Sequence, residues 1–314
     1  MANNTDQIRS LTNKIHLAGA LAELDPIKTG STKDGIPYIR LRGAIQCGPT
    51  AVYTRQFTAF IKSKKANGED SENYNKVKKW AETAVPMTKN KDNPTMVDLV
   101  GSLSANDYVN SANELVEGVS FSVQFFNDFE DYACTLDIEG YIAGVSDEER
   151  GKDDDKHFTG RKRLRLISMD FYRNVLDLKN IVIPKDLASQ LEDNGYTKGR
   201  TVLMFITYMP NEAEAKPAAK GFGTQRTTEG RSYLEMVLTG GNEAYDPDNE
   251  KMCISTATVK SLLSERSAHL NELKEKGYQG SNNSQVSTDR NGSFSSAKSA
   301  PTMSPVDDED DIPF

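Results

Sequence analysis

The chain has 314 residues, of which 37% are hydrophobic and 27% charged, and its formal net charge is −8. This length exceeds one average domain, and the composition fits a folded part beside a polar part. The three cysteines lie far apart, no CxxC or HxxxH pair occurs, and no apolar run approaches the roughly 18 residues that span a bilayer. We therefore expect a cytoplasmic protein without a disulfide framework, metal, cofactor or membrane segment.

Two segments near the start of the chain have the pattern of strands. Residues 15–24 are mostly apolar, and residues 36–46 alternate between apolar and polar side chains after a turn-rich loop. Successive side chains of a strand point to opposite faces. One face of the second segment is therefore core, and the other carries Tyr38, Arg40 and Arg42.

The next predicted strand, at 52–62, alternates without showing which face is buried. Tyr53, Arg55 and Phe57 share one face, which we assign to the surface, although Phe57 fits the core equally well. Phe60, on the other face, is expected in the core. A basic stretch ends the strand and begins the following loop, with Lys62, Lys64 and Lys65.

A helix and two more strands complete the first predicted domain. Residues 71–84 have apolar positions at helical spacing. Residues 119–125, with Phe125 on the apolar face, and residues 132–145 alternate as strands, whereas 87–118 shows no clear pattern. Five strands with a helix between the third and the fourth is the order of an OB-fold, a small barrel that binds nucleic-acid strands.

The remaining chain divides into a second β block and a tail. The fold class is mainly β with helical insertions (α+β), and the second block is either a second OB-like domain or an elaboration of the first. The predicted units are a lead-in over 1–13, an OB-fold domain over 14–146, a charged linker over 147–160, a second β domain over 161–250, a C-terminal helix over 251–276, a disordered linker over 277–306 and an acidic tip over 307–314.

The acidic tip combines five carboxylates with an apolar end. A pocket that holds it needs an apolar hole for the terminal aromatic ring and basic groups for the carboxylates. The linker before it is rich in Ser, Asn and Gly, and gives the tip a reach of roughly 30 Å. The tip residues are Asp307, Asp308, Glu309, Asp310, Asp311, Ile312, Pro313 and Phe314.

This tip closely resembles the C-terminal tip of the single-stranded DNA-binding proteins of bacteria and their phages, which end in an acidic run followed by Ile-Pro-Phe. The resemblance covers the last eight residues and the flexible stretch before them. It implies an OB-fold core that binds single-stranded DNA and a tip that recruits other replication and repair proteins. The alternative is a solubilising acidic tail, which has no reason to end in Ile-Pro-Phe.

Charge is distributed unevenly along the chain. Residues 14–65 hold nine basic and three acidic residues, whereas residues 127–155 hold eleven acidic and two basic residues. Cations neutralise phosphates, and aromatic rings stack on unpaired bases. The predicted nucleic-acid-binding residues of the first domain are Tyr38, Arg40, Arg42, Tyr53, Arg55, Phe57, Lys62, Lys64 and Lys65.

The densest basic cluster begins the second β block. We predict that it forms a second contact with DNA; the alternative, equally supported, is a solvated strand edge that charge protects from aggregation. A long loop further on is a weaker candidate, with Lys216, Lys220, Phe222 and Arg226. The cluster consists of Arg161, Lys162, Arg163 and Arg165.

Together these features predict a phage-type single-stranded DNA-binding protein of DNA replication, recombination and repair. The core coats single-stranded DNA, and the tip binds partner proteins. The alternatives are a strand-annealing or recombination mediator, and an OB-fold module that binds protein. No phosphate-binding loop, nucleophile motif or metal-ligand spacing occurs, so we expect no enzyme activity. The oligomeric state, a homo-oligomer included, is left open.

Overall fold

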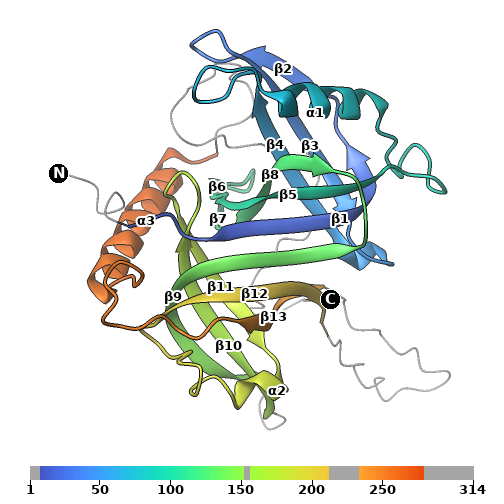
Figure 1. Ribbon diagram of the computed structural model, residues 1–314. Coiled ribbons are helices and arrows are strands. Elements are labelled where there is room, and N and C mark those ends of the chain that lie inside the picture. Colours follow the sequence, from blue (N-terminus) through green and yellow to red (C-terminus); the bar gives the residue numbers. More distant parts are fainter. Residues whose placement is uncertain (1–7, 152–155, 212–232, 279–314) are drawn as a thin grey trace, which may run out of the picture.

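The computed structural model describes residues 8–151, 156–211 and 233–278, and these residues form a mainly β fold (Figure 1). The strands are β1 (Asn13–Leu24), β2 (Lys28–Ser31), β3 (Pro37–Gln46), β4 (Thr54–Lys62), β5 (Met96–Ala105), β6 (Tyr108–Val109), β7 (Leu115–Val116), β8 (Val119–Asn127), β9 (Ala133–Arg150), β10 (His157–Met169), β11 (Val175–Ile183), β12 (Thr201–Pro210) and β13 (Leu234–Gly241). The helices are α1 (Glu72–Thr83), α2 (Lys185–Ala188) and α3 (Thr256–Lys276), with a 3-10 turn at Ala51–Tyr53.

Strands β1, β3, β4, β8 and β5 hydrogen bond in a closed order, which we call the first strand ring. The β4–β8 pair is parallel and the other pairs are antiparallel. Helix α1 lies between β4 and β5 in the chain. The alternating apolar residues of these strands, such as Leu17, Ile39 and Leu99, are fully buried. The predicted order of five strands with a helix between the third and the fourth is therefore present.

One of these five strands was not predicted. It is the fourth, β5, which lies in the segment 87–118 that showed no pattern; the strand predicted at 119–125 is β8, which is the fifth instead of the fourth. Gly101 interrupts the alternation of β5, because a β-carbon there would overlap the carbonyl oxygen of Ser122 on β8. The strand predicted at 132–145 is β9, which belongs to another set of strands.

Strands β9, β10, β11, β13 and β12 form a second strand ring. Its β11–β13 pair is parallel, and its other pairs are antiparallel. The strands of both rings pair in the same order. When each ring's strands are numbered along the chain, the first pairs with the second, the second with the third, the third with the fifth, the fifth with the fourth and the fourth with the first. Figure 1 shows the first strand ring, which runs from blue to green, above the second, which runs from green to orange.

The two strand rings also share their register. Both members of a Cα pair in the first ring are displaced by a constant number of residues along their strand in the second ring. The exception is the β10–β11 pair beyond Leu164, where the pairing shifts by one residue relative to β3–β4. The second strand ring is therefore a structural repeat of the first, although the sequence shows no evident repeat. The matching pairs are Ala20↔Gln46 with Tyr141↔Ile167, Leu24↔Gly43 with Val145↔Leu164, Phe57↔Phe121 with Ile181↔Met236, and Leu103↔Phe121 with Tyr208↔Met236.

Strands β1 and β9 join the two rings. Their first halves pair with each other, from Asn13↔Ile138 to Ala18↔Ala133, and their second halves pair with β3 and β10. All strands of both rings therefore belong to one 11-stranded sheet. Buried apolar residues from both rings also form one continuous core.

The charged segment 147–160 is not a linker, which corrects the prediction. β9 continues to Arg150 and β10 begins at His157, so most of the segment is paired strand. Its run of charges is typical of solvated chain, but Glu148 is only 4% exposed and lies against arginines of β10. The predicted boundary after residue 146 therefore falls inside a strand.

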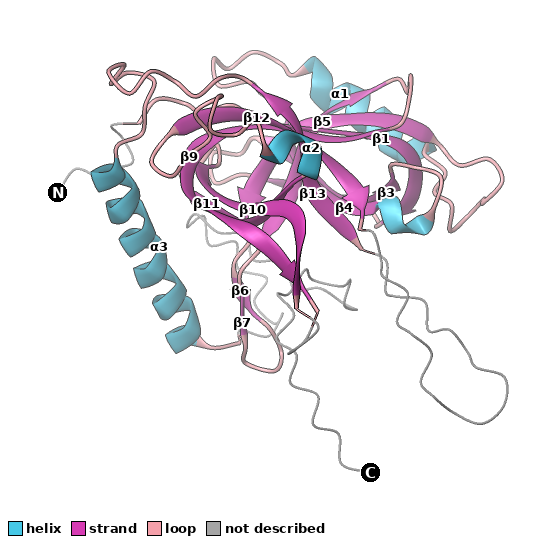
Figure 2. Ribbon diagram, turned by 90° about the horizontal axis from the view of Figure 1, so that it is seen from below, coloured by secondary structure: helices cyan, strands magenta, loops and turns pink. Residues whose placement is uncertain are grey.

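Helix α3 packs beside the second strand ring (Figure 2), and the predicted helix is confirmed. Val259 and Leu262 are buried in a small core with Tyr141 of β9. Arg266 donates to the carboxylate of Asp107 at 2.9 Å and to a backbone carbonyl of β11. No helix among the described residues is both long and apolar enough to cross a membrane.

Gly19 on β1 and Gly140 on β9 occupy equivalent positions, and at each of them the backbone of the neighbouring strand comes very close. A β-carbon at Gly140 would lie 2.5 Å from the carbonyl oxygen of Ile167, and one at Gly19 would overlap that of Gln46. Gly140→Ala should therefore lower the free energy of unfolding by about 1–3 kcal/mol. The control is Gly144→Ala on the same strand, where nothing lies within 4 Å of the new β-carbon. Equal urea midpoints for these two variants would contradict the expectation.

Candidate functional site

The outer face of β2, β3 and β4 carries cations and aromatic side chains in neighbouring rows. Arg40 on β3 is opposite Lys28 on β2 and Phe60 on β4, and Tyr38 is opposite Lys62. The aromatic rings of Tyr38 and Phe60 are 4.8 Å apart, centroid to centroid. The Arg40 guanidinium lies 5.8 Å from the Phe60 ring centroid, which is within cation–π range. These contacts hold a flat, cationic surface on the first strand ring.

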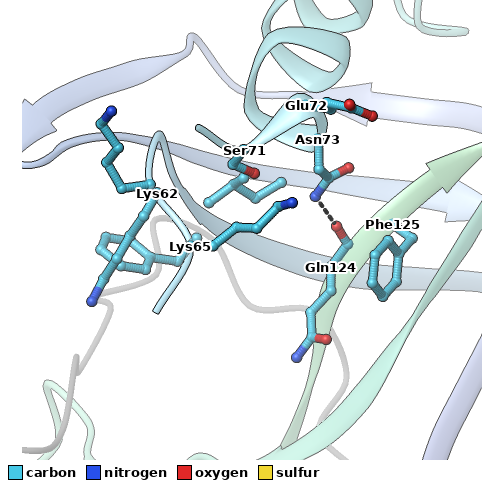
Figure 3. Close-up of a pocket in the computed structure, with 10 residues that line it drawn as sticks. Lys62, Lys65, Ser71, Glu72, Asn73, Gln124 and Phe125 are labelled. Atoms are coloured by element: carbon cyan, nitrogen blue, oxygen red, sulfur yellow. Dashed lines mark hydrogen bonds between the residues drawn. The ribbon is translucent and has the colours of Figure 1, made fainter. Parts of the chain in front are cut away.

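An open groove of ≈ 350 Å³ adjoins this face, between the end of β4, the start of α1 and β8. Phe60 and Phe125 line it and are 42% and 52% exposed. The Asn73 side chain of α1 donates to the backbone carbonyl of Gln124 at 2.7 Å, which ties the helix to β8 (Figure 3). The lining residues are Phe60, Ile61, Lys62, Lys64, Lys65, Ser71, Glu72, Asn73, Gln124 and Phe125.

Phe60 and Phe125 were both missed as surface residues, for different reasons. On β4 the apolar residues at 57, 59 and 61 form the buried face, so Phe60 points outward. On β8 the pairing with β5 shifts at Gln124, and this bulge turns Phe125 outward and Phe126 inward. A bulge inserts one residue into the alternation, and the sequence gives no sign of it.

Three predicted contact residues lie away from the groove, and the burial of Phe57 corrects its assignment. Phe57 is 1% exposed and belongs to the core, so it cannot stack on a base. Tyr53 is partly buried against the same core. The Arg55 guanidinium lies 4.8 Å from the centroid of the buried Tyr208 ring of β12, at the junction of the two strand rings.

The predicted lysines are close to the groove, and their ion pairs are weak. Lys64 pairs with Asp70 at 2.6 Å and Lys65 with Glu69 at 3.4 Å, all four on exposed loop positions. Solvent screens surface pairs of this kind and makes them weak, so a phosphate can replace the carboxylate. Lys62 makes no ion pair with any residue that the structure describes.

The second predicted cluster is held by carboxylates. Arg163 contacts both Glu148 and Glu235, the latter at 2.9 Å. Arg161 also contacts both: its Nε lies 3.1 Å from Glu148, and its Nη2 donates to Glu235. Glu148 accepts a further hydrogen bond from the Thr159 hydroxyl at 2.8 Å. These two arginines and two acids form a compact cluster, which we call the Arg–Glu cluster.

The other two cations of that stretch are paired as well. Lys162 contacts Asp147 at 2.7 Å, and Arg165 donates two hydrogen bonds to Asp177 at 2.8 and 2.7 Å. The whole predicted stretch therefore faces acidic partners on the second strand ring. Arg42, in contrast, lies on the first ring opposite Thr58 and has no ion pair within the described part of the chain.

Two groups of predicted residues fall outside the described residues. They are the loop residues Lys216, Lys220, Phe222 and Arg226 and the tip residues at 307–314. Within the described ranges, no group of three or more His, Cys, Asp or Glu side chains is placed to hold a metal ion. Cys47 and Cys134 are buried free thiols, and Cys253 is half-buried and also free.

These features define a mainly β protein with two joined strand rings, one of which carries a groove lined by lysines and exposed phenylalanines. The sequence model of the YorF family matches residues 12–276, which is most of the chain. The chain belongs to the YorF family. No curated protein matches the chain.

Among solved structures, the chain is similar to the single-stranded DNA-binding protein from Thermus aquaticus. A deletion mutant of that protein matches with a TM-score of 0.43 and 12% identity, over 76% of this chain and 98% of that chain. The wild-type protein matches with a TM-score of 0.43 and 11% identity, over 76% of this chain and 95% of that chain. Both likenesses are distant.

The Arg–Glu cluster makes the stability of the second strand ring depend on pH. Burial alone would raise the pKa of Glu148, but the Thr159 hydroxyl and the charges of Arg163 and Arg161 outweigh it and lower this pKa below its usual 4.5. A lowered folded-state pKa stabilises the fold above pH 4.5, and the contribution is lost as pH falls further. Glu148→Gln should therefore flatten the fall in melting temperature between about pH 6 and pH 3. Glu149→Gln, at the exposed neighbouring position, should keep the natural pH profile.

Proposed function

We propose that the protein binds single-stranded DNA along the outer face of β3 and β4, with unpaired bases stacking in the adjoining groove. One observation carries this proposal. Exposed Phe60 and Phe125 lie in one groove with three lysines, beside the half-buried Tyr38 and Arg40. Aromatic faces and mobile cations in one place are the combination that an unpaired strand requires.

The chemistry of this surface favours unpaired over paired strands. Cations attract the phosphates of both, but only unpaired bases expose a face on which Phe60 or Phe125 can stack. Stacking contributes about 1–3 kcal/mol per base and accepts any base. The groove residues Lys62, Lys64 and Lys65 supply charge that phosphate can reach. We infer binding with weak sequence preference and strong salt dependence.

The pairing of the strands supports an OB-fold for each strand ring. The first, second, third and fifth strands of the first ring are β1, β3, β4 and β8, and the parallel pair joins the third and the fifth. OB-folds bind oligonucleotides on the face of their second and third strands. In this chain that face is β3 and β4, where Tyr38, Arg40, Phe60 and Lys62 lie.

We further propose that the protein coats single-stranded DNA in the cytoplasm during replication, recombination or repair. A protein that binds the open strand and not the duplex shifts hairpins toward the open form by mass action. A strand-annealing mediator would use the same surface and would accelerate pairing of complementary strands. A protein-binding OB-fold would lose little affinity with salt.

The acidic tip is proposed to recruit replication and recombination proteins and to compete with DNA for the cationic face. The proposal draws on the five carboxylates before Ile312, Pro313 and Phe314, and on the basic residues at 14–65. Carboxylates can occupy a phosphate site, and a tether raises their effective concentration at that site.

The groove can be tested by truncating Phe60. Phe60→Ala should weaken binding to poly-dT roughly 5- to 150-fold, which corresponds to the loss of about one stacked base. The measurement is fluorescence anisotropy with labelled poly-dT and with duplex of equal length across a salt series. Phe171→Ala is the matched control, because Phe171 is 76% exposed on a turn of the second strand ring. A natural protein that binds duplex as tightly as poly-dT, or a Phe60→Ala variant with natural affinity, would reject the proposal.

Removing residues 307–314 tests the tip. The shortened protein should bind poly-dT more tightly than the natural one at low salt, because the competing carboxylates are gone. The difference should shrink as salt rises, because screening weakens both interactions. Anisotropy titrations of both proteins at two salt concentrations measure it. Unchanged or weaker binding at low salt would contradict the competition.

A further inference from the structure

The shared register places arginines at equivalent positions in both strand rings. Arg42 is opposite Thr58 in the β3–β4 pair, and Arg163 is opposite Val182 in the β10–β11 pair. These two pairs are neighbours of the matching pairs Phe57↔Phe121 and Ile181↔Met236. Arg40 and Arg161 each precede their partner arginine by two residues. The two rings therefore carry the same pair of cations on the same strand.

The surroundings of the two arginine pairs differ. In the first strand ring, Arg40 lies over Phe60. The position in the second ring that corresponds to Phe60, two residues after Val182, is Pro184, and it offers no aromatic face. In place of Tyr38 the second ring has Thr159, whose hydroxyl donates to Glu148. The second ring thus has no aromatic side chain at either corresponding position.

The carboxylates of the Arg–Glu cluster are too buried to be displaced. The side chains of Glu148 and Glu235 are 4% and 3% exposed, whereas those of Arg161 and Arg163 are 16% and 25% exposed. A phosphate that took either arginine would deprive both buried carboxylates of one of their two arginine partners, which is unfavourable. Asp70, the partner of Lys64 at the groove, has an exposed side chain (82%) and returns to water without this cost.

We propose that the second strand ring carries a neutralised copy of the first ring's binding site, and that Glu148 and Glu235 are the residues that neutralise it. This inference rests on the proposed function. It means that the first ring alone contacts the strand, and that the predicted second contact at Arg161 and Arg163 is closed by the protein's own carboxylates. The two buried glutamates then restrict DNA binding to one face of each chain.

The test is to remove both negative charges with Glu148→Gln and Glu235→Gln in one full-length variant. Glutamine keeps the size of the side chain and frees two arginines for phosphate. The plot of log affinity for poly-dT against log salt should steepen by about 1.4, because each added phosphate contact on a single strand contributes about 0.7. The matched control is Glu149→Gln with Glu243→Gln, which changes the net charge equally at exposed positions and should leave the slope unchanged.

A second pair of variants keeps the test decisive if the double variant does not fold. Arg161→Ala and Arg163→Ala should lower the urea midpoint and leave poly-dT affinity within about twofold of the natural protein. A loss of affinity comparable with that of Phe60→Ala would overturn the proposal, since the arginines would then contact DNA. An unchanged salt slope in the folded glutamine variant would also overturn it. Failure of the natural protein to bind poly-dT would instead reject the proposed function itself.

Discussion

The antiparallel pairing between the first halves of β1 and β9 is the constraint on which the architecture depends. Each strand uses one edge twice, first for the other ring and then for the second strand of its own ring. Neither strand ring can therefore be removed without exposing backbone hydrogen-bonding groups of the other, and such groups are costly to leave unpaired. The core residues Ile15 and Leu136, which are opposite each other at this junction, are both fully buried.

The two strand rings carry arginines at equivalent positions but in different surroundings. The first strand ring places Arg40 over the aromatic ring of Phe60, which lines the groove. The second strand ring surrounds Arg161 and Arg163 with two buried carboxylates, which pair with both arginines and balance their charge. A repeated backbone therefore does not imply a repeated site. The side chains on neighbouring strands decide whether a cation is a ligand or a structural element.

The sequence predicted where the strands lie better than which face of each strand is buried. Alternation located β1, β3 and β4 and placed Tyr38 and Arg40 on the outer face of β3, because the first half of that strand alternates regularly. It did not decide between Phe57 and Phe60, since each face of β4 carries one phenylalanine, and only tertiary packing selects the buried one. β5 was not predicted because Gly101, where the backbone of β8 comes close, interrupts the alternation of apolar residues. The charges at 147–160 appeared solvated because a run of charges does not show that Asp147 and Glu148 pair with cations of the neighbouring strand β10.

At the junction, the second strand ring packs against the two strands of the first ring that line the groove. Tyr208 of β12 is buried against Arg55 of β4 and, in an edge contact at 5.7 Å, against Phe121 of β8. β4 and β8 are the parallel pair whose outer sides present Phe60 and Phe125. The second strand ring therefore supports, from the inside, the two strands that form the groove. If β4 and β8 bind DNA as proposed, this support holds them rigid, and preorganised side chains lose less entropy on binding.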